Sequence, residues 1–251
     1  MIKTNIIVKK LLKSKNKIIW INDLKKILED FTSKWTIYKK IFWLKSRWYL
    51  LSVKKDLFYI KDSTNKIDVE EVIDNFYRKI LKNYIKNSYW QKYFIWWIKA
   101  LEIRNNNTSV PDKLVLINPY KRANEVLLKW KKIFNTIYNI KWFDTENSFK
   151  YFKKQTTKIT IDNKNFNIAN YELSILESLY SVSEIDERYI IELIKKNIRK
   201  NYKRINIEIF EYFLKVWKYW SSCKLLYEIS LWINPIFAER LKNILIKRYW
   251  I

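Results

Sequence analysis

The chain contains no glycine and no histidine in 251 residues, and only one cysteine and three prolines. Ordinary usage near 7% would give about 17 glycines. Because glycine reaches positive φ without a steric penalty, turns and helix ends normally depend on it. Without histidine the commonest general base and metal ligand is missing, and the lone Cys223 cannot form an internal disulfide. These absences argue against an enzyme and favour a reducing compartment.

Tryptophan, by contrast, occurs 13 times. The composition is typical of a genome very poor in G and C, which avoids GGN glycine codons, and some bacterial lineages of this kind read UGA as glycine. Our hypothesis is that many of these tryptophans are glycines in the cell. Five of them fall where turns or element junctions are expected: Trp48, Trp96, Trp97, Trp217 and Trp220. The alternative is a genuinely tryptophan-rich protein, with the rings packed in a core or an interface.

Long hydrophobic runs are also absent. Lysine recurs throughout, so no stretch approaches the 18 apolar residues of a membrane-spanning helix. The first residues, MIKTNIIVKKLLKSKNK, lack the apolar segment and cleavage site of a secretory signal. We therefore expect a cytoplasmic protein without a membrane span.

Positive charge dominates what is present. The net charge is +25, and residues 1 to 60 hold 15 lysines and arginines against four acidic residues, a net charge of +11. Such an excess favours a polyanionic partner, and nucleic acid in general, because phosphate charge attracts it whatever the base sequence. AAA lysine codons also accumulate on solvated faces in AT-rich genomes, so part of the charge reflects mutational bias. The N-terminal segment is the expected nucleic-acid face.

Residues 1–62 have the pattern of a winged helix-turn-helix domain. Apolar spacing predicts one helix ending near Lys15, a second that follows the short extended segment IIW, and a third that begins after Thr32 or Ser33. In the third helix we expect Trp35, Tyr38, Ile41, Phe42 and Leu44 to turn inward. The alternating YLLSVKKDLFYIKD predicts a two-stranded hairpin with Lys54, Lys55 and Asp56 at its tip.

In a winged helix the third helix enters the major groove and the hairpin touches the backbone. The residues expected to contact DNA are Lys34, Thr36, Lys39, Lys40, Lys45, Arg47, Lys54 and Lys55. The alternative is a three-helix packing unit whose lysines are merely solvated, and winged helices also serve in protein contacts.

The rest of the chain predicts an α+β protein: a linking helix over 63–89, then a mixed domain over 90–251 with a small β-sheet and a C-terminal helical array. KLVLINP predicts a buried strand, and NSFKYFKKQTTKITIDNKNFNI one or two strands with a turn at Asn163 and Lys164. From Ala169 the pattern becomes helical. A second basic cluster lies within this array, at Lys195, Lys196, Arg199, Lys200, Lys203 and Arg204.

Catalysis is not expected from the remaining polar residues. Glu172, Glu177, Asp186 and Glu187 are interpreted as helix caps or solvated groups rather than a paired acid and base. No phosphate-binding P-loop can be written, even with every tryptophan replaced by glycine. We expect no cofactor and no metal site.

Four segments, in order along the chain, resemble motifs of the AbiEi-type antitoxins of bacterial type IV toxin-antitoxin systems. RWYLLSVKKDLFYI is similar to the family's wing, with Trp48 and Asp56 in place of two glycines. YFIWWIKALEIR, TKITIDNKNFNIANYELSILESLY and KVWKYWSSCKLLYEIS are similar to three later segments. The residues that match there are Ala100, Leu101, Glu102, Glu172, Leu176, Leu225, Leu226 and Glu228.

The resemblance implies a winged-helix repressor of its own promoter, a monomer that binds inverted repeats of double-stranded DNA cooperatively. It further implies that the C-terminal domain counteracts a nucleotidyltransferase toxin without forming a stable complex. The alternative from composition is an organelle-encoded ribosomal or other RNA-binding protein, in which high charge, AT bias and UGA read as tryptophan would also coincide.

Overall fold

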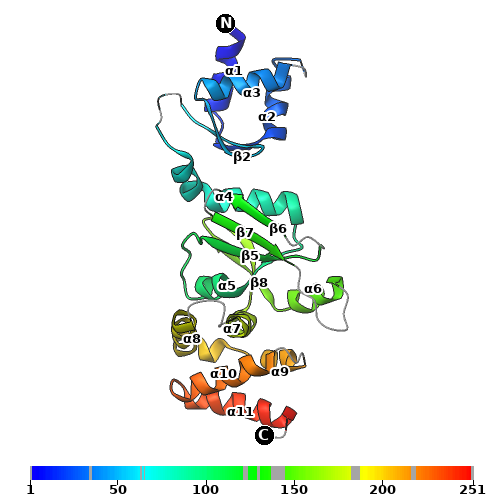
Figure 1. Cartoon of the computed structure of the whole chain (residues 1–251), viewed down its shortest axis with the longest axis vertical. Coiled ribbons are helices and arrows are strands. Elements are labelled where there is room, and N and C mark those ends of the chain that lie inside the picture. Colours follow the sequence, from blue (N-terminus) through cyan, green and yellow to red (C-terminus); the bar gives the residue numbers. More distant parts are fainter. Residues whose placement is uncertain are drawn as a thin grey trace. The chain divides into compact units, whose positions relative to one another are not determined.

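A computed structural model describes residues 2–33, 36–62, 64, 66–120, 124–128, 131–136, 145–181, 187–215 and 219–249 (Figure 1). The fold mixes helices and strands, with the helices concentrated toward the C-terminus. Two compact units are present: residues 1–84 with 127–130, and residues 85–126 with 131–251. None of the described helices is both long and apolar enough to cross a membrane.

The boundary between the units lies inside helix α4 (Val69–Tyr89), at residues 84 and 85, rather than on either side of the 63–89 segment. Val72, Ile73, Tyr77 and Ile85 of this helix are at most 3% exposed. The apolar side of α4 is therefore buried.

The first unit has the element order helix, strand, helix, helix, strand, strand. These are α1 (Ile2–Leu12), β1 (Ile18–Trp20), α2 (Ile21–Glu29), α3 (Ile37–Ser46), β2 (Leu50–Lys54) and β3 (Leu57–Ile60). The strands form an antiparallel sheet in the order β1-β3-β2. Buried residues of all three helices, among them Leu11, Leu24 and Leu44, pack into one core with Leu50 and Phe58 of the sheet.

The burial of α3 agrees with the prediction in part, since Ile41 and Leu44 are buried as predicted. Its buried residues are Ile37, Ile41 and Leu44, which recur at helical spacing along one side. Tyr38 is 60% exposed and Phe42 is 72% exposed, whereas both were expected to turn inward. The helix meets the sheet with its isoleucines, because Ile37 and Ile41 belong to the same core cluster as Leu50 and Phe58. Trp35 lies outside the described residues.

The C-terminus of α3 ends in a Schellman motif. The N–H of Trp48 donates to the Lys45 carbonyl at 3.0 Å, and the N–H of Tyr49 donates to the Leu44 carbonyl at 2.9 Å. Trp48 has φ 63°, the left-handed conformation that glycine usually supplies at this position. A bulky side chain is rare there.

The second unit is built on a six-stranded mixed sheet in the order β6-β7-β5-β4-β9-β8. Its strands are β4 (Phe94–Ile95), β5 (Lys113–Ile117), β6 (Asn124–Leu128), β7 (Lys131–Thr136), β8 (Thr156–Ile161) and β9 (Lys164–Ala169). β5 pairs parallel with β7, and β8 and β9 form an antiparallel hairpin. The hairpin turns at Asp162 and Asn163, which both have positive φ. Residues 147–153, expected to extend this strand pattern, instead belong to helix α6 (Thr145–Lys153).

Helices complete the second unit. They are α5 (Trp97–Arg104), α7 (Tyr171–Tyr180), α8 (Glu187–Asn201), the 3-10 turn η3 (Tyr202–Arg204), α9 (Ile207–Leu214), α10 (Trp220–Leu231) and α11 (Pro235–Tyr249). α7 packs against α5 on one side and against α10 on the other, so it lies between the sheet end of the unit and the C-terminal helices (Figure 1). One continuous core joins them, with Leu176, Phe213 and Leu226 among its members.

Candidate nucleic-acid interface

The solvent-facing surface of α3 combines two exposed lysines, Lys39 and Lys45, with two aromatic rings. Lys39 is exposed between Tyr38 and Phe42. Tyr38 is held from α2: the Lys25 ammonium donates to its hydroxyl at 2.6 Å and lies 4.5 Å from its ring centroid. Such a cation over an aromatic face is favourable, so Lys25 fixes the ring in place. The sequence pattern did not identify Tyr38 and Phe42 as surface residues.

The other residues on or beside α3 that were predicted to contact DNA differ in their exposure to solvent. Lys45 and Arg47 are exposed, whereas Lys40 is half-buried and its ammonium lies 4.7 Å from the Trp43 ring centroid. The Thr36 hydroxyl donates to the Ser33 carbonyl at 2.9 Å, so it stabilises the start of the helix. Lys34 lies outside the described residues.

The hairpin β2–β3 is shorter at its tip than the wing we expected. Lys54 is the last residue of β2 and pairs with Leu57, so Lys55 and Asp56 alone form the turn. The Asp56 carbonyl accepts from the N–H of Ile21 at 2.8 Å, which ties the turn to the start of α2. Asp56 has φ 63°, a conformation that aspartate adopts more readily than most residues, so this turn forms without glycine.

Of the two hairpin lysines, only Lys55 is exposed. The Lys54 ammonium lies 5.8 Å from the Tyr84 ring centroid of α4, and burial lowers the pKa of Lys54. Lys54 therefore does not lie at the tip of the hairpin, because its side chain contacts Tyr84 of α4. The exposed cations that α3 and the hairpin present are Lys39, Lys45, Arg47 and Lys55.

The second basic cluster is on the surface of the second unit. Five of its members are exposed: Lys196, Arg199, Lys200, Lys203 and Arg204. Lys195 is half-buried and forms an ion pair with Glu192 at 2.7 Å. The buried side of α8 carries Ile190, Ile194 and Ile198, so its lysines and arginines occupy the side that faces water. The cluster follows the last turns of α8 into η3.

The carboxylates of α7 support the fold. Glu172 is buried and accepts from the backbone N–H of Asn206 at 2.6 Å, at the start of α9. Glu177 is fully buried and accepts from the Tyr219 hydroxyl, and burial raises its pKa to about 8. Burial also raises the pKa of the Cys223 thiol to about 12, so the reactive thiolate is disfavoured. Glu187 was interpreted as a helix cap or a solvated group, and it lies in the first turn of α8. Asp186 lies outside the described residues.

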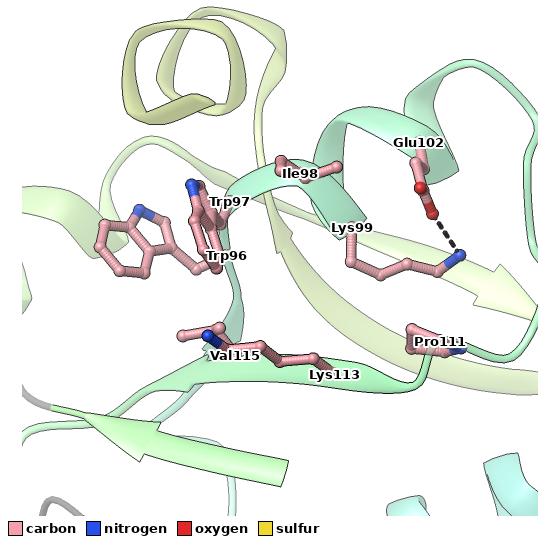
Figure 2. A pocket seen from close by; sticks show the side chains of 8 residues that line it. All are labelled: Trp96, Trp97, Ile98, Lys99, Glu102, Pro111, Lys113 and Val115. Carbon is pink, nitrogen blue, oxygen red and sulfur yellow. Dashed lines mark hydrogen bonds and ion pairs between the residues drawn. The ribbon is translucent and has the colours of Figure 1, made fainter. Parts of the chain in front are cut away.

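A cavity of about 390 Å³ lies beside the start of α5 (Figure 2). The residues lining it are Trp96, Trp97, Ile98, Lys99, Glu102, Pro111, Lys113 and Val115. The buried Lys99 and the half-buried Glu102 form an ion pair, with Lys99 Nζ 2.7 Å from Glu102 Oε2, and the Tyr189 hydroxyl donates to Glu102 Oε1 at 2.6 Å. The charges are thus satisfied within the protein, and the pair supports α5 against the start of α8.

No group of three or more cysteine, aspartate or glutamate side chains that could hold a metal ion occurs among the residues that the structure describes. The chain matches no protein-family model, and a search of curated proteins finds no significant match. Function is therefore inferred from the site itself.

Proposed function

We propose that the chain is a DNA-binding transcriptional repressor that acts as the antitoxin of a type IV toxin-antitoxin system. In this proposal residues 1–62 form a winged helix-turn-helix domain, α3 enters the major groove of double-stranded DNA, and the β2–β3 hairpin contacts the backbone. The observation that carries the proposal is the solvent-facing side of α3, where Lys39 lies exposed opposite the buried Ile37 and Ile41.

Two further observations support DNA as the partner. The element order of the first unit, helix, strand, helix, helix and a terminal two-stranded hairpin, supports a winged helix, since it is the order of that domain type. Exposed cations occur on both parts that would face DNA, at Lys39, Lys45 and Arg47 beside the groove and Lys55 at the hairpin. The charge excess of residues 1 to 60 supplies attraction to phosphate.

The antitoxin role rests on the resemblance of four motifs to the AbiEi-type family. The positions that match contribute to the second unit: Ala100, Leu101 and Leu226 are fully buried, and Glu172 bonds to the start of α9. The exposed basic cluster of α8 and η3 offers a second charged surface. We propose that this unit counteracts a nucleotidyltransferase toxin, and that the protein acts in the cytoplasm.

The proposal is tested with the full chain and a duplex from upstream of its own coding sequence. We expect binding, repression of a reporter driven by that sequence, and loss of both in Lys39→Gln/Lys55→Gln. The matched control is Lys224→Gln/Lys242→Gln, which removes two exposed lysines from the second unit. Equal repression by the two double variants would contradict the assignment of α3 and the hairpin. Preference for RNA over the duplex would favour the ribosomal alternative.

A further inference from the structure

The proposed recognition surface of α3 contains an unusual pair of exposed rings. Phe42 is 72% exposed, and Tyr38, one turn earlier on the same side, is 60% exposed. Single exposed apolar side chains are common on proteins and need no explanation. Two neighbouring exposed aromatic rings on a helix proposed to enter DNA do require one.

Lysine is the one type of side chain on this helix that binds bases with two hydrogen bonds. The side chains that bind guanine or adenine with two hydrogen bonds are arginine, lysine, asparagine and glutamine. Between Ile37 and Ser46, the sequence IYKKIFWLKS contains no arginine, asparagine or glutamine. The Ser46 hydroxyl donates to the Trp43 carbonyl at 2.9 Å, and Lys40 is directed over the Trp43 ring. What α3 presents toward a groove is therefore aromatic surface together with the exposed Lys39 and Lys45.

Only thymine places an apolar group in the major groove, its C5 methyl, and apolar side chains including phenylalanine contact it. Tyr38 is positioned for such a contact because Lys25 holds its ring from α2, which reduces the entropic cost of binding. Phe42 lies one turn further along and would meet a base further along the groove.

We propose that Phe42 and Tyr38 read thymine methyl groups in the major groove, so that the protein selects sites with thymines at the positions facing α3. This inference rests on the proposed function, since it assumes that α3 enters DNA. In this proposal the exposed Lys39 supplies charge to a neighbouring phosphate, a contact that carries no base preference.

The test compares alternating poly(dA-dT) with poly(dA-dU), which lacks only the methyl group, at one salt concentration. For the full wild-type chain we expect weaker binding to the dU duplex, by about fourfold for each thymine methyl group that a ring covers. Phe42→Ala should bind the dT duplex more weakly and discriminate less between the two. Because Phe42 lies at the surface, its removal should not affect folding, which circular dichroism checks.

The control variant is Trp232→Ala, which removes a ring that is 92% exposed in the second unit and should leave the discrimination unchanged. Salt-dependent binding with equal affinity for the two duplexes would overturn the thymine inference while leaving the proposed function intact. Absence of salt-dependent binding to either duplex would overturn both. If Phe42→Ala leaves both affinities unchanged and instead converts a dimer to a monomer, the aromatic face serves a second copy of the chain, and the inference is wrong.

Discussion

At the scale of single residues, three of the tryptophans that the structure describes have backbone conformations that suit glycine; Trp217 lies outside the described residues. Trp48, Trp90 and Trp97 have φ values of 63°, 55° and 66°. Left-handed backbone costs an ordinary residue about 1–2 kcal/mol. Two of the side chains gain little from burial in exchange, because Trp48 is 59% and Trp90 is 65% exposed. The third, Trp97, is buried but its indole N–H has no hydrogen-bond partner. These positions support the hypothesis that UGA is read as glycine.

Trp48→Gly should therefore stabilise the first unit. Glycine removes the left-handed penalty at the end of α3, and the side chain that disappears is 59% exposed. Its ring contacts the buried Lys61, whose ammonium lies 5.4 Å from the ring centroid. We expect the free energy of unfolding to rise by about 1 kcal/mol, measured by urea denaturation with circular dichroism.

Trp232→Gly is the matched control for this stabilisation. Trp232 is still more exposed but has φ −86°, so glycine there relieves no strain and adds unfolded-state entropy. We expect no gain from it. A gain of similar size in both variants would mean that removing an exposed ring, not relieving positive φ, causes the stabilisation.

The buried carboxyl of Glu177 gives a prediction about pH. Its pKa is about 8 in the fold against 4.5 in the unfolded chain. Between these values the folded chain holds a proton that the unfolded chain has released, so stability is greatest at low pH and falls as pH rises. For one proton the slope is up to about 1.4 kcal/mol per pH unit.

Glu177→Gln should remove this slope and stabilise the second unit at pH 8, because the amide oxygen can still accept from Tyr219 and no charge is buried. Denaturation at pH 5 and pH 8 measures it. Glu192→Gln, at a solvent-exposed carboxylate, is the control and should leave the pH difference nearly as it is. An unchanged slope in Glu177→Gln would show that another group causes it.

At the scale of elements, the sequence predicted both β-hairpins, because alternation and turn residues are local features of the chain. The β2–β3 hairpin followed from alternation of apolar residues, and the β8–β9 hairpin from alternation with a turn predicted at Asn163 and Lys164. The turn lies one residue earlier, at Asp162 and Asn163, because Lys164 already pairs with Ile161. The orientation of α3 did not follow, because apolar residues occur on two of its sides. Which side faces the core is decided by the packing partner, here Leu50 and Phe58, and that contact is not local in sequence. The exposed Tyr38 and Phe42 were missed for the same reason.

The surface of α8 carries a prediction of its own. Lys196→Glu/Arg199→Glu reverses two exposed charges beside Glu192 and should abolish rescue of growth during co-expression with the cognate toxin, while leaving DNA affinity unchanged. Lys39→Gln/Lys55→Gln should lower DNA affinity and leave the rescue of growth unchanged. The growth assay is run with the full chain in both cases. Rescue by both variants would show that the α8 cluster merely solvates the helix.

At the scale of the whole molecule, the composition itself can be tested by mass. Protein isolated from its native cell should have an intact mass below the 31.2 kDa of the tryptophan-containing chain. Each tryptophan decoded as glycine lowers the mass by about 129 Da, a covalent difference that no common modification reproduces. A native mass equal to 31.2 kDa would refute the recoding and favour a genuinely tryptophan-rich protein.

The net charge of the chain is +25, and residues 1 to 60 hold +11 of it. If α3 and the hairpin bind phosphate, each contact releases counterions, and the slope of log K against log salt counts them. This slope distinguishes a defined interface from diffuse attraction, because only substitutions at the interface reduce it.

The most direct test of DNA binding by the first unit is therefore the salt dependence of affinity for double-stranded DNA in three full-length proteins. We expect a steep slope for wild type and for Lys224→Gln/Lys242→Gln, and a slope smaller by about 2 for Lys39→Gln/Lys55→Gln. Identical slopes in all three proteins would contradict the assignment of α3 and the β2–β3 hairpin as the DNA-binding surface.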